Sequence, residues 1–111
     1  MVTDIDMDAI IRQAEAFIGF RKSDDAINML RIKEAPSDAR LCALLARAYF
    51  QKGDTKGDVF SSHFFSSRAM ELGNTDRAIL AIRAISAFRK ERFAEAIEYF
   101  IKFIDENATP S

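Results

Sequence analysis

The clearest pattern of apolar and polar positions in this chain follows Phe93. Apolar residues recur there at the three- and four-residue spacing that forms one stripe on an α-helix: Ala96, Ile97, Phe100, Ile101 and Ile104. The preceding stretch from Ile79 to Phe88 is almost entirely apolar, and charged residues at 89–92 separate the two. The pattern predicts two helices joined by a tight turn, with the first helix covered on several sides.

Helical periodicity and capping signals predict four helices earlier in the chain. Ser23 and Asp38 are residues of the kind that cap helix N-termini, while Pro36 and Gly53 mark places where a helix ends. The only loop-like stretch is 54–58. The expected helices cover approximately the ranges 4–20, 24–34, 39–52 and 59–72. Together with the hairpin, they make an all-α chain of six helices in three pairs.

The pairs of helices carry related sequences. Ala26-x3-Leu30 recurs 70 positions later as Ala96-x3-Phe100, which corresponds to two periods of 35 residues. Self-similarity at such a period is typical of proteins in which helical hairpins stack on one another. The chain is therefore expected to be built from repeats.

One of these pairs resembles a known repeat. The segment Cys42-x2-Leu45-Ala46-x2-Tyr49 is similar to the first-helix signature W-x2-L-G-x2-Y of the tetratricopeptide repeat (TPR). The small residue of that signature occurs once in each pair, at Ala14, Ala46 and Ala84. The resemblance implies a right-handed α-solenoid of three TPR-like helical hairpins. The resemblance also implies that this solenoid is a single domain over 1–111, with repeats at approximately 5–36, 37–73 and 74–107 and a tail at 108–111.

Charge and hydropathy narrow the classes of partner. The net charge is -1, from 16 basic and 17 acidic residues, so the chain has no bulk attraction to nucleic acid or to an anionic membrane. There is no apolar run of about 18 residues that could insert in a membrane, and the acidic first ten residues lack the pattern of a signal peptide. We therefore expect a cytoplasmic protein.

Candidate chemistry is sparse. Cys42 and His63 are the only residues of their types, and their separation suggests neither metal-ligand spacing nor a nucleophile with an oriented base. Gly53 and Gly57 are not followed by the Lys-Ser or Lys-Thr of a phosphate-binding loop. The aspartates of the first eight residues resemble a calcium loop, but Ala9 stands where that loop needs glycine. We expect no enzyme activity, metal or cofactor.

The placement of charge suggests a binding surface. The expected first helices of the second and third pairs carry arginine and lysine but no acid between 39 and 53 and between 77 and 90. In proteins that resemble TPRs, first helices line a concave groove. The expected contacts of an acidic or amphipathic segment are Ile11, Arg40, Arg47, Phe50, Gln51, Phe88 and Arg89. The alternative is a solvated face without a partner.

Relatives that bind the tail of heat-shock chaperones do so with lysine and asparagine on these helices. The aligned positions here hold Ile11, Glu15, Ala43, Arg47, Ala81 and Ile85, so that partner is not expected.

The C-terminal helix is expected to leave apolar surface uncovered. Phe93, Tyr99 and Phe103 are additional to its core stripe, and a second copy or a partner helix would cover them. The alternative is that Tyr99 and Phe103 pack inward.

The function predicted overall is a protein-binding adaptor or scaffold. A small dedicated chaperone, similar to those of type III secretion, and a structural homo-oligomer such as a homodimer are the alternatives.

Overall fold

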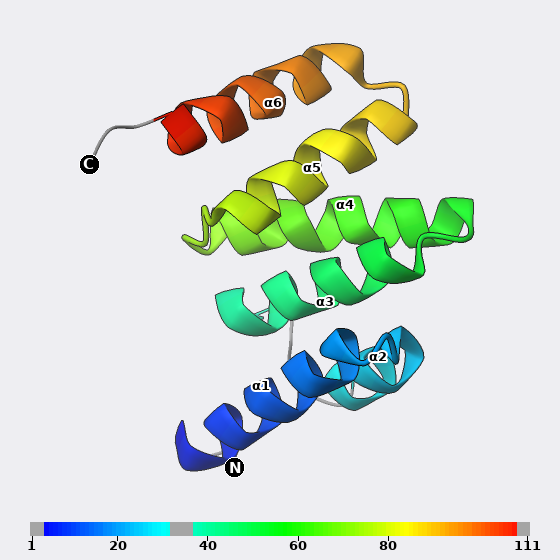
Figure 1. Ribbon diagram of the computed structural model, residues 1–111, viewed down its shortest axis with the longest axis vertical. Helices are drawn as coiled ribbons and strands as arrows, with labels where there is room; N and C mark the ends of the chain where they lie inside the picture. Colours follow the sequence, from blue (N-terminus) through cyan, green and yellow to red (C-terminus); the bar gives the residue numbers. More distant parts are fainter. Residues whose placement is uncertain (1–3, 32–36, 109–111) are drawn as a thin grey trace.

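The structure is a computed structural model that describes residues 4–31 and 37–108, and these residues are all-helical (Figure 1). They form six helices and no strand, as the sequence predicts: α1 (Asp4–Gly19), α2 (Ser23–Arg31), α3 (Ala39–Lys52), α4 (Lys56–Glu71), α5 (Arg77–Arg89) and α6 (Phe93–Ala108).

The helices are arranged in chain order along the long direction of Figure 1, from α1 at the bottom to α6 at the top. Each helix packs on the next one in the chain, and α3 also contacts both α1 and α5. The odd-numbered helices therefore form a continuous layer. At the end of the array α6 packs chiefly on α5.

Buried apolar side chains join the helices across this array. One group connects α1, α2 and α3 through residues that include Ile18, Leu30 and Leu45. A second group connects α3, α4 and α5 through residues that include Cys42 and Ile79. The three alanines at the small position of the repeat signature are each 0% exposed, which allows the helices to approach closely: Ala14, Ala46 and Ala84.

The helix ends follow capping chemistry, with two corrections to the sequence prediction. Asp38 caps α3 as expected, because its side chain accepts hydrogen bonds from the backbone N–H groups of the first turn. The expected loop at 54–58 is shorter, because Thr55 and Asp58 form a capping box that starts α4 at Lys56. The hydroxyl of Ser23, expected to cap α2, instead donates to Gln51.

The first and third pairs share one turn conformation. Arg21 and Glu91 both have φ of 61°, the left-handed region that side chains other than glycine rarely adopt. In each turn the backbone N–H of the next residue donates a hydrogen bond to the carbonyl five residues before it. The distance is 2.7 Å from Lys22 to Phe17 and 2.9 Å from Arg92 to Ala87. The two turns lie 70 positions apart, the same separation as that between Ala26-x3-Leu30 and Ala96-x3-Phe100.

Glu91→Gly is expected to raise the free energy of unfolding by about 0.5 kcal/mol. Glycine relieves the strain of the left-handed backbone, and this gain exceeds the cost of the greater backbone entropy that glycine gives the unfolded chain. Glu91 is exposed, so the change removes no packing. Urea denaturation measures the effect. Gly73→Ala is a control with the opposite expected sign. Gly73 has φ of 101°, a conformation that is strained for alanine, so this change should lower the free energy of unfolding. A loss of stability in Glu91→Gly would contradict the strain argument.

Candidate functional site

The layer formed by α1, α3 and α5 contains two adjoining hollows, which together we call the α1–α3–α5 groove. The larger has a volume of about 450 Å³, and the smaller has a volume of about 200 Å³ and shares Arg47 and Ala78 with it. Apart from these two shared residues, the larger hollow is lined by Ile18, Arg21, Phe50, Gln51, Ala81 and Ile82.

The larger hollow combines an apolar floor with positive charge. Phe50 and Ile82 come from α3 and α5, while Arg21 reaches it from the turn after α1. No acidic residue is among its lining residues. Arg47 makes no hydrogen bond or ion pair within the described part of the chain, and Arg21 is exposed. The two guanidinium groups are therefore available to a carboxylate.

The smaller hollow is less positive than the sequence pattern suggested. Glu15 and Asp76 line it together with Arg40 and Arg47. Arg40 forms ion pairs with Asp38 at 3.3 Å and Asp8 at 3.9 Å. Its charge is thus partly balanced inside the protein, which weakens Arg40 as a contact for a partner. Four of the positions aligned with the chaperone-binding clamp also line this hollow: Ile11, Glu15, Ala43 and Arg47.

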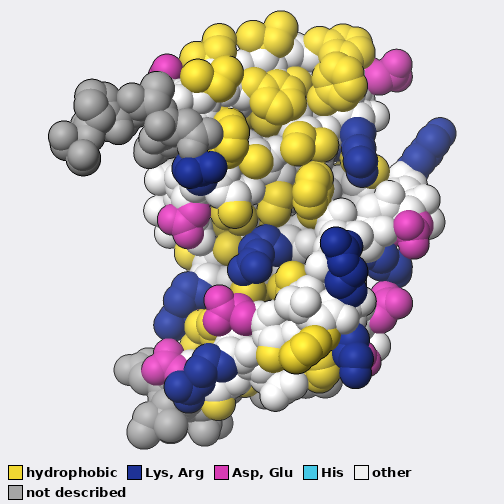
Figure 2. All heavy atoms as spheres, viewed as in Figure 1, with side chains coloured by type: hydrophobic (Ala, Val, Ile, Leu, Met, Phe, Trp, Pro, Cys, Tyr) yellow, Lys and Arg dark blue, Asp and Glu magenta, His cyan; other side chains and the backbone are white. Residues whose placement is uncertain are grey.

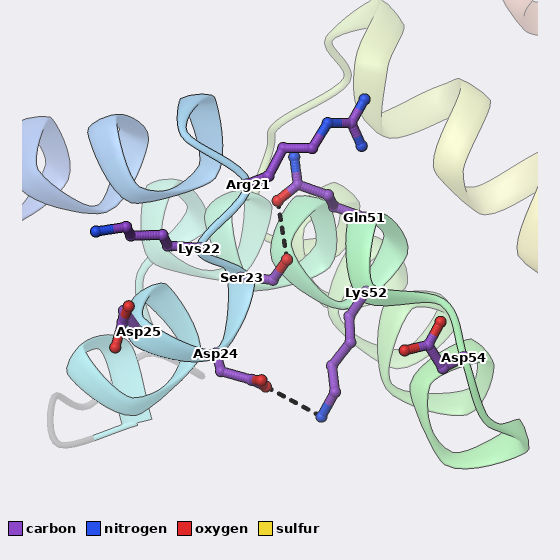
Figure 3. A pocket seen from close by; sticks show the side chains of 8 residues that line it. All are labelled: Arg21, Lys22, Ser23, Asp24, Asp25, Gln51, Lys52 and Asp54. Atoms are coloured by element: carbon purple, nitrogen blue, oxygen red, sulfur yellow. Dashed lines mark hydrogen bonds and ion pairs between the residues drawn. The ribbon is translucent and has the colours of Figure 1, made fainter.

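Gln51 has a structural task that the sequence did not reveal. Its Nε2 donates to the carbonyl of Ile18 at 2.8 Å. Its Oε1 accepts from the hydroxyl of Ser23 at 2.8 Å, and Figure 3 draws this second bond. Each end of the amide therefore makes one hydrogen bond, to the last turn of α1 and to the first residue of α2. Gln51 therefore ties the end of α3 to the residues on either side of Arg21, and it also lines the groove.

The polar pocket beside this turn contains an ion pair between two of its lining residues. Lys52 forms an ion pair with Asp24 (Figure 3), at 3.1 Å, and lies 3.9 Å from Asp58. The hydrogen bond from Lys52 to Asp24 raises the pKa of the ammonium group. The buried Asp58 also accepts from the backbone N–H of Asp54 and Thr55. These contacts join α2, α3 and α4.

The two remaining predicted groove residues lie apart from each other. The guanidinium of Arg89 lies over the ring of Phe50 at 5.9 Å, so Arg89 belongs to the edge of the groove. Phe88 does not line the groove, and its ring packs edge-on against Phe93 at 5.6 Å. Conversely, no pattern in the sequence indicated Arg21, because its place depends on a left-handed turn without glycine.

The inner face of α6 differs from the sequence prediction. Tyr99 and Phe103 are half-buried beneath two arginines of α5, with Arg83 at 4.4 Å from the centre of the Tyr99 ring and Arg77 at 5.4 Å from that of Phe103. Both aromatic residues therefore pack inward, which was the alternative. Of the three predicted interface residues, only Phe93 is largely exposed, at 51%.

The predicted core stripe of α6 faces outward instead. Four of its apolar side chains are between 36% and 60% exposed: Ile97, Phe100, Ile101 and Ile104. Only Ala96 of that stripe is buried. The inward stripe is formed by Ala96, Tyr99 and Phe103, and it has the same helical spacing. Figure 2 shows apolar side chains gathered over α5 and α6 at the upper end of the molecule.

A polar network ties α4, α5 and α6 together around His63. His63 Nε2 lies 2.5 Å from Glu95 Oε2, which also accepts from Arg83 Nε at 3.2 Å. His63 Nδ1 lies 3.5 Å from the ammonium of Lys90. The neutral imidazole with its proton on Nε2 satisfies both contacts, because it donates to Glu95 and accepts from Lys90.

The pKa shifts agree with this neutral tautomer. Burial lowers the pKa of His63, and the charges of Lys90 and Arg83 act in the same direction, against the opposing effect of Glu95. Burial raises the pKa of Glu95, but the hydrogen bonds from His63 and Arg83 outweigh it and hold that pKa below its usual value. The network is thus a hydrogen-bonded structural element rather than a base poised beside a nucleophile.

Cys42 lies on the buried side of α3 and is 0% exposed. Burial raises the pKa of its thiol, which favours the unreactive protonated form.

Among the described residues, no helix is long and apolar enough to cross a membrane.

Comparisons of the chain with models of protein families, with curated proteins and with solved structures gave no match.

Proposed function

We propose that this chain is a protein-binding module that takes a segment of a partner protein into the α1–α3–α5 groove. The proposal includes the finer architecture that the TPR resemblance implies, a right-handed α-solenoid of three hairpins with its first helices on the concave side. The observation that carries it is the larger hollow, where an apolar floor and two arginines with no acidic lining residue lie together.

The chemistry of the groove defines the partner segment. An apolar side chain would rest on Phe50 and Ile82, where contact replaces exposed apolar surface. A neighbouring aspartate, glutamate or terminal carboxylate would bind between Arg21 and Arg47 through charge-assisted hydrogen bonds. The preferred ligand is therefore a short segment that combines one bulky apolar residue with one carboxylate.

Arg47→Glu is expected to weaken peptide binding by about tenfold or more, because it removes a charge-assisted contact and repels the ligand carboxylate. Peptides selected from a displayed random library against the wild-type chain serve as probes, and fluorescence anisotropy gives their affinities. The difference should widen at low salt, where electrostatic attraction is least screened.

Arg12→Glu is the matched control, since Arg12 is exposed on α1 and does not line the groove. It makes the same change in net charge and should leave affinity nearly unchanged. Equal affinities of the wild type and Arg47→Glu at low salt would contradict the proposed site, as would selected peptides without acidic residues.

A further inference from the structure

The outer face of α6 is an uncovered apolar surface at the end of the helical array. Six large side chains on this face and at the adjoining end of α5 are between 36% and 60% exposed: Phe88, Phe93, Ile97, Phe100, Ile101 and Ile104. Since a phenylalanine side chain buries about 150–250 Å² when fully covered and an isoleucine is smaller, together they expose on the order of 500 Å² of apolar area. Such an area reaches the upper range of the largest apolar patch on ordinary monomers.

The spacing on this face is that of a helix-pairing seam. Phe93, Ile97, Phe100 and Ile104 follow one another at steps of four, three and four residues, which are the a and d positions of a heptad repeat. Such a seam fits another α-helix, with side chains of one helix inserted between those of the other.

We propose that a second copy of this chain covers the outer face of α6, through antiparallel pairing of the two α6 helices about a two-fold axis. The spacing of four, three and four reads the same in both directions, so the two seams stay in register. The pairing sets Phe93 against Ile104 of the second copy and Ile97 against Phe100, so each ring meets a smaller branched side chain.

Charge and area both fit a second copy. The positions that flank the seam, where charges usually determine partner choice, hold uncharged residues: Ala94, Ala96, Ile101 and Phe103. On the rim, Glu98 and Lys102 pair with each other at 3.2 Å and so offer no net repulsion. About 65% of a homodimer interface is apolar, so 500 Å² of apolar area corresponds to roughly the 800 Å² per partner of a stable interface.

The mass of the wild-type chain in solution is the first test, measured by light scattering after size exclusion across a concentration series. We expect twice the mass of one chain. Ile97→Lys and Phe100→Glu should each raise the dimer dissociation constant about thirtyfold or more, because each places a charge at the centre of the seam. Phe64→Glu is the control, since Phe64 is 49% exposed on α4, away from the seam, and this variant should remain dimeric.

Mixing the two seam variants tests the antiparallel arrangement. Ile97→Lys and Phe100→Glu should recover a dimer when combined, because the lysine of one chain then faces the glutamate of the other. Ile97→Lys with Ile104→Glu should not recover one, because Ile104 faces Phe93. A wild-type chain that keeps the mass of one copy at every concentration overturns the proposal, and a mixture that fails to dimerise overturns the antiparallel pairing. Arg47→Glu should leave the dimer intact, so this inference and the groove proposal can fail independently.

Discussion

Leu45→Ala is expected to lower the free energy of unfolding by about 3 kcal/mol, the usual cost of truncating a fully buried leucine. Leu45 lies on α3 and is 1% exposed, within the buried group that also holds residues of α1 and α2. Because side chains from several helices surround it, the space left by the truncation closes only in part, and the cavity adds to the lost burial. Urea denaturation followed by circular dichroism measures the change.

Phe20→Ala is the control for Leu45→Ala. It removes more apolar atoms, but Phe20 is 77% exposed in the turn after α1, so the expected change is within about 0.5 kcal/mol. Comparable losses in the two variants would contradict the packing of α3 between its neighbours.

Glu95→Ala is expected to lower the free energy of unfolding by about 2 kcal/mol at neutral pH, because it leaves the buried His63 and the half-buried Arg83 without their acceptor. In the wild-type chain both donors contact the same carboxylate oxygen of Glu95, His63 at 2.5 Å and Arg83 at 3.2 Å. Glu98→Ala is the matched control on the same helix. Its carboxylate contacts Lys102 at an exposed i, i+4 pair, which contributes no more than about 0.5 kcal/mol.

The loss in Glu95→Ala should depend on pH in a defined direction. The pKa of Glu95 is lowered in the folded chain, so its stabilising effect is fully present above the usual glutamate pKa of about 4.3 and is lost as pH falls through the lowered value. The difference between wild type and Glu95→Ala should therefore shrink in acid. A difference that stayed constant from pH 7 to about pH 3 would show that the carboxylate charge plays no part in it.

The sequence predicted the helices well because the signals that define them are local. Periodicity of three and four residues determines which segments are helical, and Asp38 and Gly53 determine where α3 begins and ends. The start of α4 was misplaced because Thr55 and Asp58 cap it together, and this reciprocal pair precedes a segment with weak apolar periodicity.

The groove could be predicted in part. Ile11, Arg47 and Phe50 line it, as expected from their place on first helices. Gln51 also lines it, but its hydrogen bonds to Ile18 and Ser23 were not foreseen, and Arg21 was missed, because both features depend on the contact between the α1–α2 segment and the end of α3. Such a contact joins residues about 30 positions apart, and a single sequence does not encode it in any local pattern.

The sequence by itself determined that α6 is an amphipathic helix after a tight turn, but only the tertiary structure decided which of its faces is buried. Two stripes with the same spacing run along α6, and Ala96 belongs to both. Two features select the inner stripe. Arg77 and Arg83 of α5 lie over the rings of Phe103 and Tyr99, and Glu95 on that side meets His63. These are interactions between helices, which periodicity along one helix cannot rank.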